Sequence, residues 1–127
     1  MPDKTVLVVE DDDLNMKLVR EVLRLGQYGI LEATDAETGI ALARQHHPDL
    51  ILMDIHLPDM DGLSATRVIH ADQDLMGIPV VALTALAMQG DREKALEAGC
   101  IEYVTKPFRI MDLLTLLDRQ LNRETRR

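Results

Sequence analysis

Side chains that could hold a metal ion and carry a phosphoryl group occur at four separated places in this chain. Four consecutive acids at positions 10–13 (EDDD) follow one apolar run, and Asp54 follows another. Thr84 and Lys106 each close a later apolar run, and Pro107 follows the lysine. Like charges about 4 Å apart repel each other by roughly 4 kcal/mol at an effective dielectric constant of about 20. The four acids must therefore point apart, or a cation must offset their repulsion.

The chemistry that these residue types favour is metal-assisted phosphoryl transfer. Mg²⁺ prefers oxygen ligands, usually takes one or two carboxylates and keeps several waters, which suits Asp11 and Asp54. A carboxylate can also be a nucleophile. A metal ion and a lysine can neutralise charge on the transferring group, and a hydroxyl can hydrogen-bond one of its oxygens. The prediction holds only if the fold brings Asp54, Thr84 and Lys106 together.

Five apolar runs alternate with stretches of helical spacing, and this pattern indicates how the site is assembled. Strands are predicted at 5–9, 29–33, 50–53, 80–83 and 101–104. Helices are predicted at 13–25, 34–46, 63–71, 88–98 and 110–121. Strands that are apolar along their whole length, alternating with helices, indicate an α/β fold with a parallel sheet covered on both faces. We expect a five-stranded, doubly wound sheet in the order 2-1-3-4-5, with ligands bound at the carboxyl ends of the first and third strands.

Each candidate residue also has a simpler interpretation when it is considered alone. An aspartate after a strand is most often a turn or cap residue, and Asp12 or Asp13 is placed to cap the first helix. Thr84 alone would be an ordinary strand-end residue, and Lys106 alone a solvated charge. Their order along the chain favours a functional site. Acids end the first predicted strand, one acid ends the third, a threonine ends the fourth and a Lys-Pro pair ends the fifth.

Local signals give further expectations. The first helix carries an apolar stripe at helical spacing, formed by Leu14, Leu18, Val22 and Leu25, with Val19 and Leu23 beside them. Gly26 is placed to end that helix, and Thr34 with Glu37 forms a capping box for the next one. The weak second strand suits an edge of the sheet. Three histidines are expected at the surface: His46, His47 and His70.

Length and composition suit one soluble domain. We expect a single domain over 1–127, with a core at about 4–122. A net charge of −8 and only 2% aromatic residues argue against a nucleic-acid surface. No apolar run is long enough to span a membrane. The one cysteine, Cys100, is expected in the core and cannot form an internal disulfide, which favours the reducing cytoplasm.

Blocks from most of the chain resemble the response-regulator receiver domains of two-component signalling. These blocks are VLVVEDD, DLILMDIHLPDMDG, IPVVALTA and GCIEYVTKPF. The resemblance implies that Asp54 accepts a phosphoryl group from a histidine of a kinase or of a histidine phosphotransfer protein. It also implies that Mg²⁺, or alternatively Mn²⁺, binds among Glu10, Asp11 and Asp54, with the backbone carbonyl of His56 as a further ligand.

The same resemblance implies a switch. Thr84 would move toward the phosphoryl group, Lys106 would contact it, and Tyr103 would turn inward on activation. The peptide bond before Pro107 would be cis. The output surface would be built from the fourth helix, fifth strand and fifth helix, at about 88–121, and would act on a downstream regulatory protein.

Two kinds of receiver resemble this chain most. LNMKL and TALAMQGDREKALEAGC resemble stand-alone receivers controlling bacterial cell division, the DivK type, and also receivers at the ends of hybrid histidine kinases. The start of the chain and its short tail favour the stand-alone form. We expect a monomer, or a weak homodimer that pairs through the last helix, with no nucleic-acid or membrane partner.

Other classes of protein fit the sequence less well. An aspartyl phosphatase usually has a second acid two residues after its nucleophile, where this chain has His56. A flavodoxin-like electron carrier shares the predicted fold, but its phosphate-binding loop and aromatics are missing. The P-loop pattern GxxxxGK[ST] is absent. A receiver that works without phosphorylation would usually have lost an acid, the threonine or the lysine. We therefore expect a signalling receiver rather than an enzyme.

The side chain of His56 could influence dephosphorylation, although the simpler interpretation is that only its backbone matters.

Overall fold

The computed structural model describes residues 3–85 and 90–122. Within these residues, one sheet contains five parallel strands in the order β2-β1-β3-β4-β5. The strands are β1 (Thr5–Val9), β2 (Gly29–Ala33), β3 (Leu50–Asp54), β4 (Val80–Thr84) and β5 (Glu102–Thr105). The predicted α/β fold, its strand order and the edge position of the second strand are confirmed.

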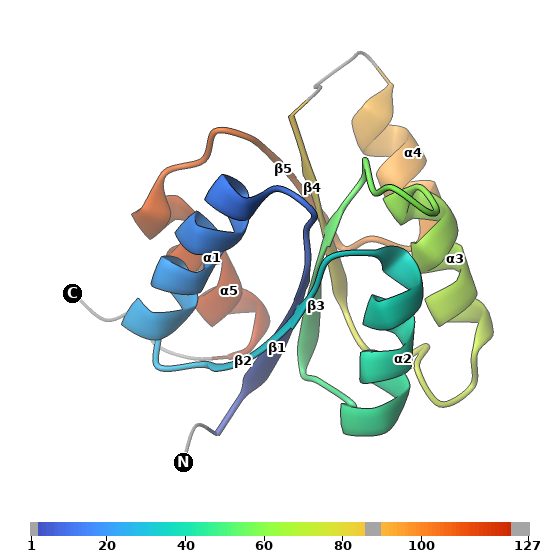
Figure 1. Cartoon of the computed structure of the whole chain (residues 1–127), viewed down its shortest axis with the longest axis horizontal. Helices are drawn as coiled ribbons and strands as arrows, with labels where there is room; N and C mark the ends of the chain where they lie inside the picture. The colour runs from blue at the N-terminus through green and yellow to red at the C-terminus, as the bar shows by residue number, and fades with distance from the viewer. Residues whose placement is uncertain (1–2, 86–89, 123–127) are drawn as a thin grey trace.

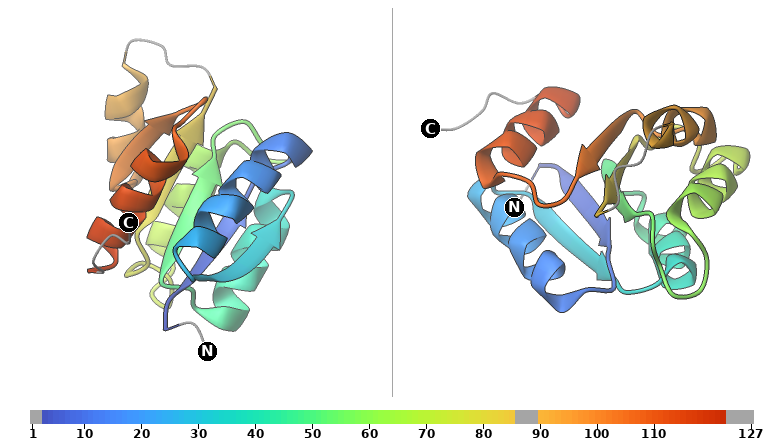
Figure 2. Two further views of the ribbon diagram at one scale, coloured as in Figure 1. Left: turned by 90° about the vertical axis from the view of Figure 1, so that its left-hand side faces the viewer. Right: turned by 90° about the horizontal axis from the view of Figure 1, so that it is seen from above.

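Helices cover both faces of the sheet, as Figures 1 and 2 show. The helices are α1 (Asp13–Leu25), α2 (Ala36–His46), α3 (Gly62–Ala71), α4 (Asp91–Ala98) and α5 (Ile110–Gln120). The helices α1 and α5 lie on one face, and α2, α3 and α4 lie on the other. The predicted start of the fourth helix, at 88, lies outside the described residues.

Three strands end one residue later than predicted. The register explains all three ends, since Asp54 pairs with Leu83 and Thr84 pairs with Thr105 across neighbouring strands. The hydrogen-bonded ladder therefore continues into the polar residues at the strand ends, and these residues are held as firmly as the strands themselves.

Alternate residues of the central strands face two separate apolar clusters. Leu7 and Val9 of β1 face the cluster beneath α2, α3 and α4, whereas Val6 and Val8 face the cluster beneath α1 and α5. Successive side chains of a strand point to opposite faces of the sheet. Burial on both faces explains why these strands are apolar along their whole length.

The helix predicted from this apolar spacing is confirmed as α1, but three of the four residues on the stripe reach solvent. Leu14 is 67% exposed, Leu25 is 53% exposed and Leu18 also reaches solvent. The residues that α1 buries are Met16, Val19, Val22 and Leu23. The helix carries more apolar residues than one face can bury, and its packing against the sheet and α5 selects the face that contains Val19 and Leu23.

The capping box predicted for α2 is also wrong. The helix begins at Ala36 and its N-cap is Asp35, whose Oδ1 accepts a hydrogen bond from the Thr38 amide at 2.7 Å. Asp35 has an extended backbone, from which a short carboxylate reaches the third helical amide. Thr34 therefore lies one residue too early to be the cap.

One of the three histidines differs from its prediction. His46 and His47 are exposed as expected, but His70 is half-buried. Its Nε2 is buried and has no hydrogen-bond partner among the residues that the structure describes. The His70 ring lies close against Gly99, just after α4, where an added Cβ would approach Cδ2 to 2.4 Å. Cys100 is buried, as predicted. In the described part of the chain, no helix has the length and apolar character needed to cross a bilayer.

Candidate functional site

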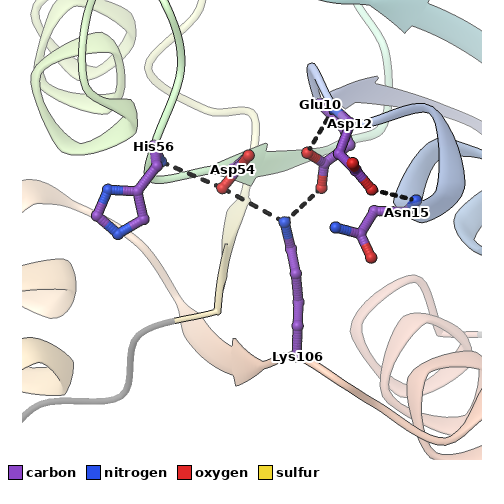
Figure 3. A network of polar contacts seen from close by, with 6 residues as sticks. All are labelled: Glu10, Asp12, Asn15, Asp54, His56 and Lys106. Atoms are coloured by element: carbon purple, nitrogen blue, oxygen red, sulfur yellow. Dashed lines mark hydrogen bonds and ion pairs between the residues drawn. The ribbon is translucent and has the colours of Figure 1, made fainter.

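The carboxyl ends of four strands bring the candidate residues to one edge of the sheet. Glu10 follows β1, Asp54 ends β3, Thr84 ends β4 and Lys106 follows β5. Figure 3 shows Glu10, Asp54 and Lys106 pointing toward one another. Glu10, Asp54 and Thr84 are all buried. As predicted, the edge of the parallel sheet at the carboxyl ends of its strands brings together carboxylates, a hydroxyl group and a lysine.

Three carboxylates at this edge could hold a metal ion. One oxygen from each of Glu10, Asp11 and Asp54 lies within 4.8 Å of the others. Glu10 and Asp54 are buried, whereas Asp11 is exposed and opens the cluster to solvent. Such a set of hard oxygen donors, open on one side, suits a small divalent cation that keeps several waters.

His56 meets the site through its backbone. Its amide donates a hydrogen bond to Asp54 Oδ1 at 3.1 Å. Its ring is exposed and points away from the acids, as Figure 3 shows. The structure therefore places the His56 backbone, rather than its imidazole, beside Asp54.

Lys106 is the main positive charge at the site. Its Nζ donates to Glu10 Oε1 at 2.6 Å and lies 3.5 Å from Asp54 Oδ1. The lysine side chain is only 8% exposed, so these contacts lie in a poorly hydrated environment. Lys106 therefore contacts Asp54, and an ion pair with Glu10 accompanies this contact. The sequence indicated only that both side chains reach the same edge of the sheet.

The four consecutive acids avoid mutual repulsion by pointing in different directions. Asp12 is the N-cap of α1, where its Oδ2 accepts a hydrogen bond from the Asn15 amide at 2.9 Å. Asp13 lies in the first helical turn, where the helix dipole favours a negative charge. Only Glu10 and Asp11 remain to face Asp54, and Lys106 offsets part of their charge. The prediction that one aspartate caps the helix is confirmed for Asp12.

The charge on Glu10 remains incompletely compensated. Burial raises the pKa of its carboxyl from 4.5 to about 7, and the neighbouring Asp54 adds to this effect. Lys106 lowers the pKa of Glu10, but not enough to restore the ordinary value. A divalent cation bound at this cluster would supply further positive charge.

The two predicted switch residues contact each other. Tyr103 is a half-buried residue of β5 that packs against the apolar cluster beneath α2, α3 and α4. Burial and the negative charge of Asp91 raise the pKa of the Tyr103 phenol, and a hydrogen bond with the Thr84 hydroxyl partly offsets this rise. The Lys106–Pro107 peptide bond is cis, as expected.

Comparison with known proteins identifies the class to which this fold and site belong. The family model for the response regulator receiver domain matches residues 6–118, so the chain belongs to the receiver domains of two-component signalling. Over 107 residues it is 45% identical to the polar-differentiation response regulator DivK of Brucella ovis, and the match covers 84% of this chain and 87% of that protein. The resemblance drawn from the sequence blocks, including its DivK type, is confirmed.

Two solved structures show the same fold. The receiver domain of the sensor histidine kinase PA1611 from Pseudomonas aeruginosa is 39% identical, with a TM-score of 0.86 and coverage of 94% of this chain and 98% of that one. The response regulator Rcp1 is 30% identical, with a TM-score of 0.79 and coverage of 98% and 97%. The first has a magnesium ion coordinated in its active-site cleft, and the second is a Mn²⁺-bound form. Together with the acidic cluster at the sheet edge, these relatives support Mg²⁺ or Mn²⁺ as the cofactor.

We expect the affinity for Mg²⁺ to fall as the pH drops below about 7, because the cation must then displace a proton from Glu10. The dissociation constant should rise by up to about tenfold per pH unit.

Because folding raises the pKa of Glu10, the metal-free protein should lose stability as the pH rises from 4.5 to about 7. Mg²⁺ should offset this loss, so the Mg²⁺-induced rise in melting temperature should be larger at about pH 8 than at about pH 5.5.

A Glu10→Gln variant is the control for this pH dependence, since it keeps the size of the side chain and removes the titrating group. Its response to Mg²⁺ should vary less with pH than that of the parent protein. A parent protein whose Mg²⁺-induced stabilisation is the same at both pH values would contradict the role assigned to Glu10.

Proposed function

We propose that Asp54 is the phosphoacceptor of this receiver and takes a phosphoryl group from a phosphohistidine on a kinase or a histidine phosphotransfer protein. The carboxylate oxygen forms a bond to phosphorus while the bond between phosphorus and the imidazole nitrogen breaks, and the nitrogen retains the electron pair. The observation that carries the proposal is the buried Asp54 carboxylate, which has Lys106 Nζ at 3.5 Å and lies within the acidic cluster.

The surrounding residues have separate tasks in this proposal. Lys106 neutralises charge on the phosphoryl oxygens, and the Thr84 hydroxyl donates a hydrogen bond to one of them. Glu10, Asp11, Asp54 and the carbonyl of His56 would hold a divalent cation, which would supply further charge neutralisation. Ala85, after β4, is small and exposed, so it leaves room for the donor to approach.

An exposed apolar surface beside the site supports a protein as the phosphodonor. Leu14 and Leu18 lie one turn apart on α1 and both reach solvent. The amide of Asp12, the N-cap of that helix, donates a hydrogen bond to Glu10 Oε2 at 3.2 Å, so this surface starts at the edge of the site. A partner that docks on Leu14 and Leu18 would bring its histidine close to Asp54.

The output of the proposed receiver is a change in protein–protein contacts. Phosphorylation adds about two negative charges beside Thr84, and the Thr84–Tyr103 contact can carry this change to β5. The surface of α4, β5 and α5 exposes four large apolar side chains: Leu96, Ile101, Ile110 and Met111. We assign this surface to a downstream regulatory protein or to weak pairing of two copies. The protein would act in the cytoplasm as one domain, without nucleic acid or membrane, and would catalyse only its own phosphorylation and dephosphorylation.

Two other assignments remain open to test. A receiver from a hybrid histidine kinase would use the same chemistry, and the PA1611 receiver, which comes from a sensor histidine kinase, is 39% identical to this chain. A phosphorylation-independent binding module would keep its partner contacts after Asp54→Asn substitution, and a partner titration with that variant would distinguish it.

The direct test uses acetyl phosphate and intact-mass spectrometry. We expect the protein to gain the mass of one phosphoryl group with Mg²⁺ and to gain none with a chelator present. Proteolytic mapping should locate the added group on the peptide that contains Asp54. No gain by a folded protein that binds Mg²⁺ would overturn the phosphoacceptor assignment and favour the phosphorylation-independent module.

A further inference from the structure

The loop between β3 and α3, residues 55–61, is fixed at both of its ends. The Ile55 amide donates to the Leu83 carbonyl at 3.0 Å, and the Gly62 amide donates to the Ile55 carbonyl at 2.7 Å. A Cβ added at Gly62 would lie 2.1 Å from the Asp54 carbonyl oxygen, so only glycine allows this close approach. Asp61 caps α3 through the Ser64 amide at 2.8 Å. Between these ends, the His56 amide donates to Asp54 Oδ1, and the middle of the loop, 57–60, depends on other contacts.

Asp59 connects the middle of this loop to a different helix. Its Oδ1 accepts a hydrogen bond from the Ala36 amide at 2.9 Å, and its Oδ2 accepts one from the Glu37 amide at 3.0 Å. These are the first two amides of α2, and the first amides of a helix have no acceptor within the helix itself. Both bonds hold the pKa of Asp59 below its usual range, so the carboxylate stays charged at the positive end of the helix dipole.

The start of α2 is a firm anchor for this connection. The strand β2 leads into it, and the Glu10 amide donates to the Ala33 carbonyl at the end of β2 at 2.9 Å. Inside the helix, Gly39 packs so closely on β1 that an added Cβ would lie 2.6 Å from Val9 Cγ2. Figure 1 shows α2 beside α3 on the same face of the sheet. Asp59 therefore ties a loop of the site to a helix that is itself fixed against β1.

We propose that Asp59 is a positioning residue for the metal site, holding the β3–α3 loop so that the His56 carbonyl faces the cation bound by Asp11 and Asp54. This inference rests on the proposed metal role of the His56 carbonyl. Asp59 acts through the backbone of the loop, three residues after His56, and is not itself one of the ligands. Leu57 and Met60 also pack against the core, but apolar packing is non-directional. Two hydrogen bonds to one carboxylate fix an orientation as well as a position.

The test compares two substitutions that remove the same charge from the same end of α2. Asp59→Ala removes the acceptor for Ala36 and Glu37 and releases the loop. Asp35→Ala removes the acceptor for Thr38 but leaves the loop tied. Mg²⁺ affinity is measured by calorimetric titration of each full-length variant, and melting temperature without metal is measured in parallel. Both variants should melt at a lower temperature, because each leaves helical amides without a partner.

Only one of the two variants should lose metal affinity. We expect Asp59→Ala to bind Mg²⁺ roughly tenfold more weakly than the parent protein, which is the loss typical when a residue that orients a metal ligand is removed. The Mg²⁺ affinity of Asp35→Ala should stay within about twofold of that of the parent protein. Asp59→Asn, which keeps an oxygen acceptor but loses the charge, should bind Mg²⁺ more tightly than Asp59→Ala.

Three results would overturn the inference. If Asp59→Ala keeps the parent affinity, the loop does not depend on this residue. If both alanine variants weaken equally, the effect belongs to the helix or to net charge. If Asp59→Asn and Asp59→Ala bind equally weakly, long-range charge explains the loss. A parent protein that binds no Mg²⁺ would instead refute the metal site itself. Failure of the metal site can therefore be distinguished from failure of the role assigned to Asp59.

Discussion

An Asp54→Asn variant should take up no phosphoryl group from acetyl phosphate, even at saturating Mg²⁺. The amide oxygen is a poor nucleophile, and the buried position of Asp54 leaves little room for another side chain to replace it. Intact-mass spectrometry over the same time course as for the parent protein measures the loss. Asp74→Asn, which removes one charge at an exposed loop position, should retain full uptake.

The same substitution should make the metal-free protein more stable. Asp54 is one cause of the raised pKa of Glu10, through both a side-chain hydrogen bond and its charge. Without that charge, the pKa of Glu10 should return toward 4.5 and the buried acids should repel each other less. The melting temperature without Mg²⁺ should therefore rise, and the further rise on adding Mg²⁺ should shrink. Uptake that persists in Asp54→Asn would identify another acceptor, with the exposed Asp11 as the first candidate.

Most of the site was predictable from the order of residues along the chain. In a parallel sheet every carboxyl end lies at the same edge, so a residue that ends a strand is placed without any knowledge of side-chain packing. Asp54 and Thr84 extend the strand ladder itself, and Glu10 and Lys106 follow their strands directly. For such positions, recognising the strand is enough to predict the neighbours.

The features that escaped prediction depend on packing between elements. Helical spacing predicted α1, but the contacts of this helix with the sheet and α5 leave Leu14 and Leu18 exposed. A local pattern made Thr34 the cap of α2, whereas Asp35 caps it. The second acceptor for that helix, Asp59, comes from 22 residues beyond Glu37, and no local rule finds a carboxylate at such a distance.

A Lys106→Met variant should take up the phosphoryl group from acetyl phosphate roughly a hundredfold more slowly, as expected when one preorganised charged donor is lost. Lys106 Nζ lies 3.5 Å from Asp54 Oδ1, where it can neutralise charge that develops on the transferring group. Methionine keeps much of the aliphatic packing but carries no charge. Lys17→Met, at an exposed position on α1, is the matched control and should leave the rate unchanged.

The response of Lys106→Met to Mg²⁺ should separate a chemical role of the lysine from a structural one. Because Lys106 lowers the pKa of Glu10, its loss should raise that pKa above about 7 and make Mg²⁺ binding near neutral pH weaker. At higher pH, where Glu10 is ionised in both proteins, saturating Mg²⁺ should restore metal binding but not the rate of uptake. If saturating Mg²⁺ at high pH also restores the rate, Lys106 serves only to compensate Glu10, and its proposed contact with the phosphoryl group is wrong.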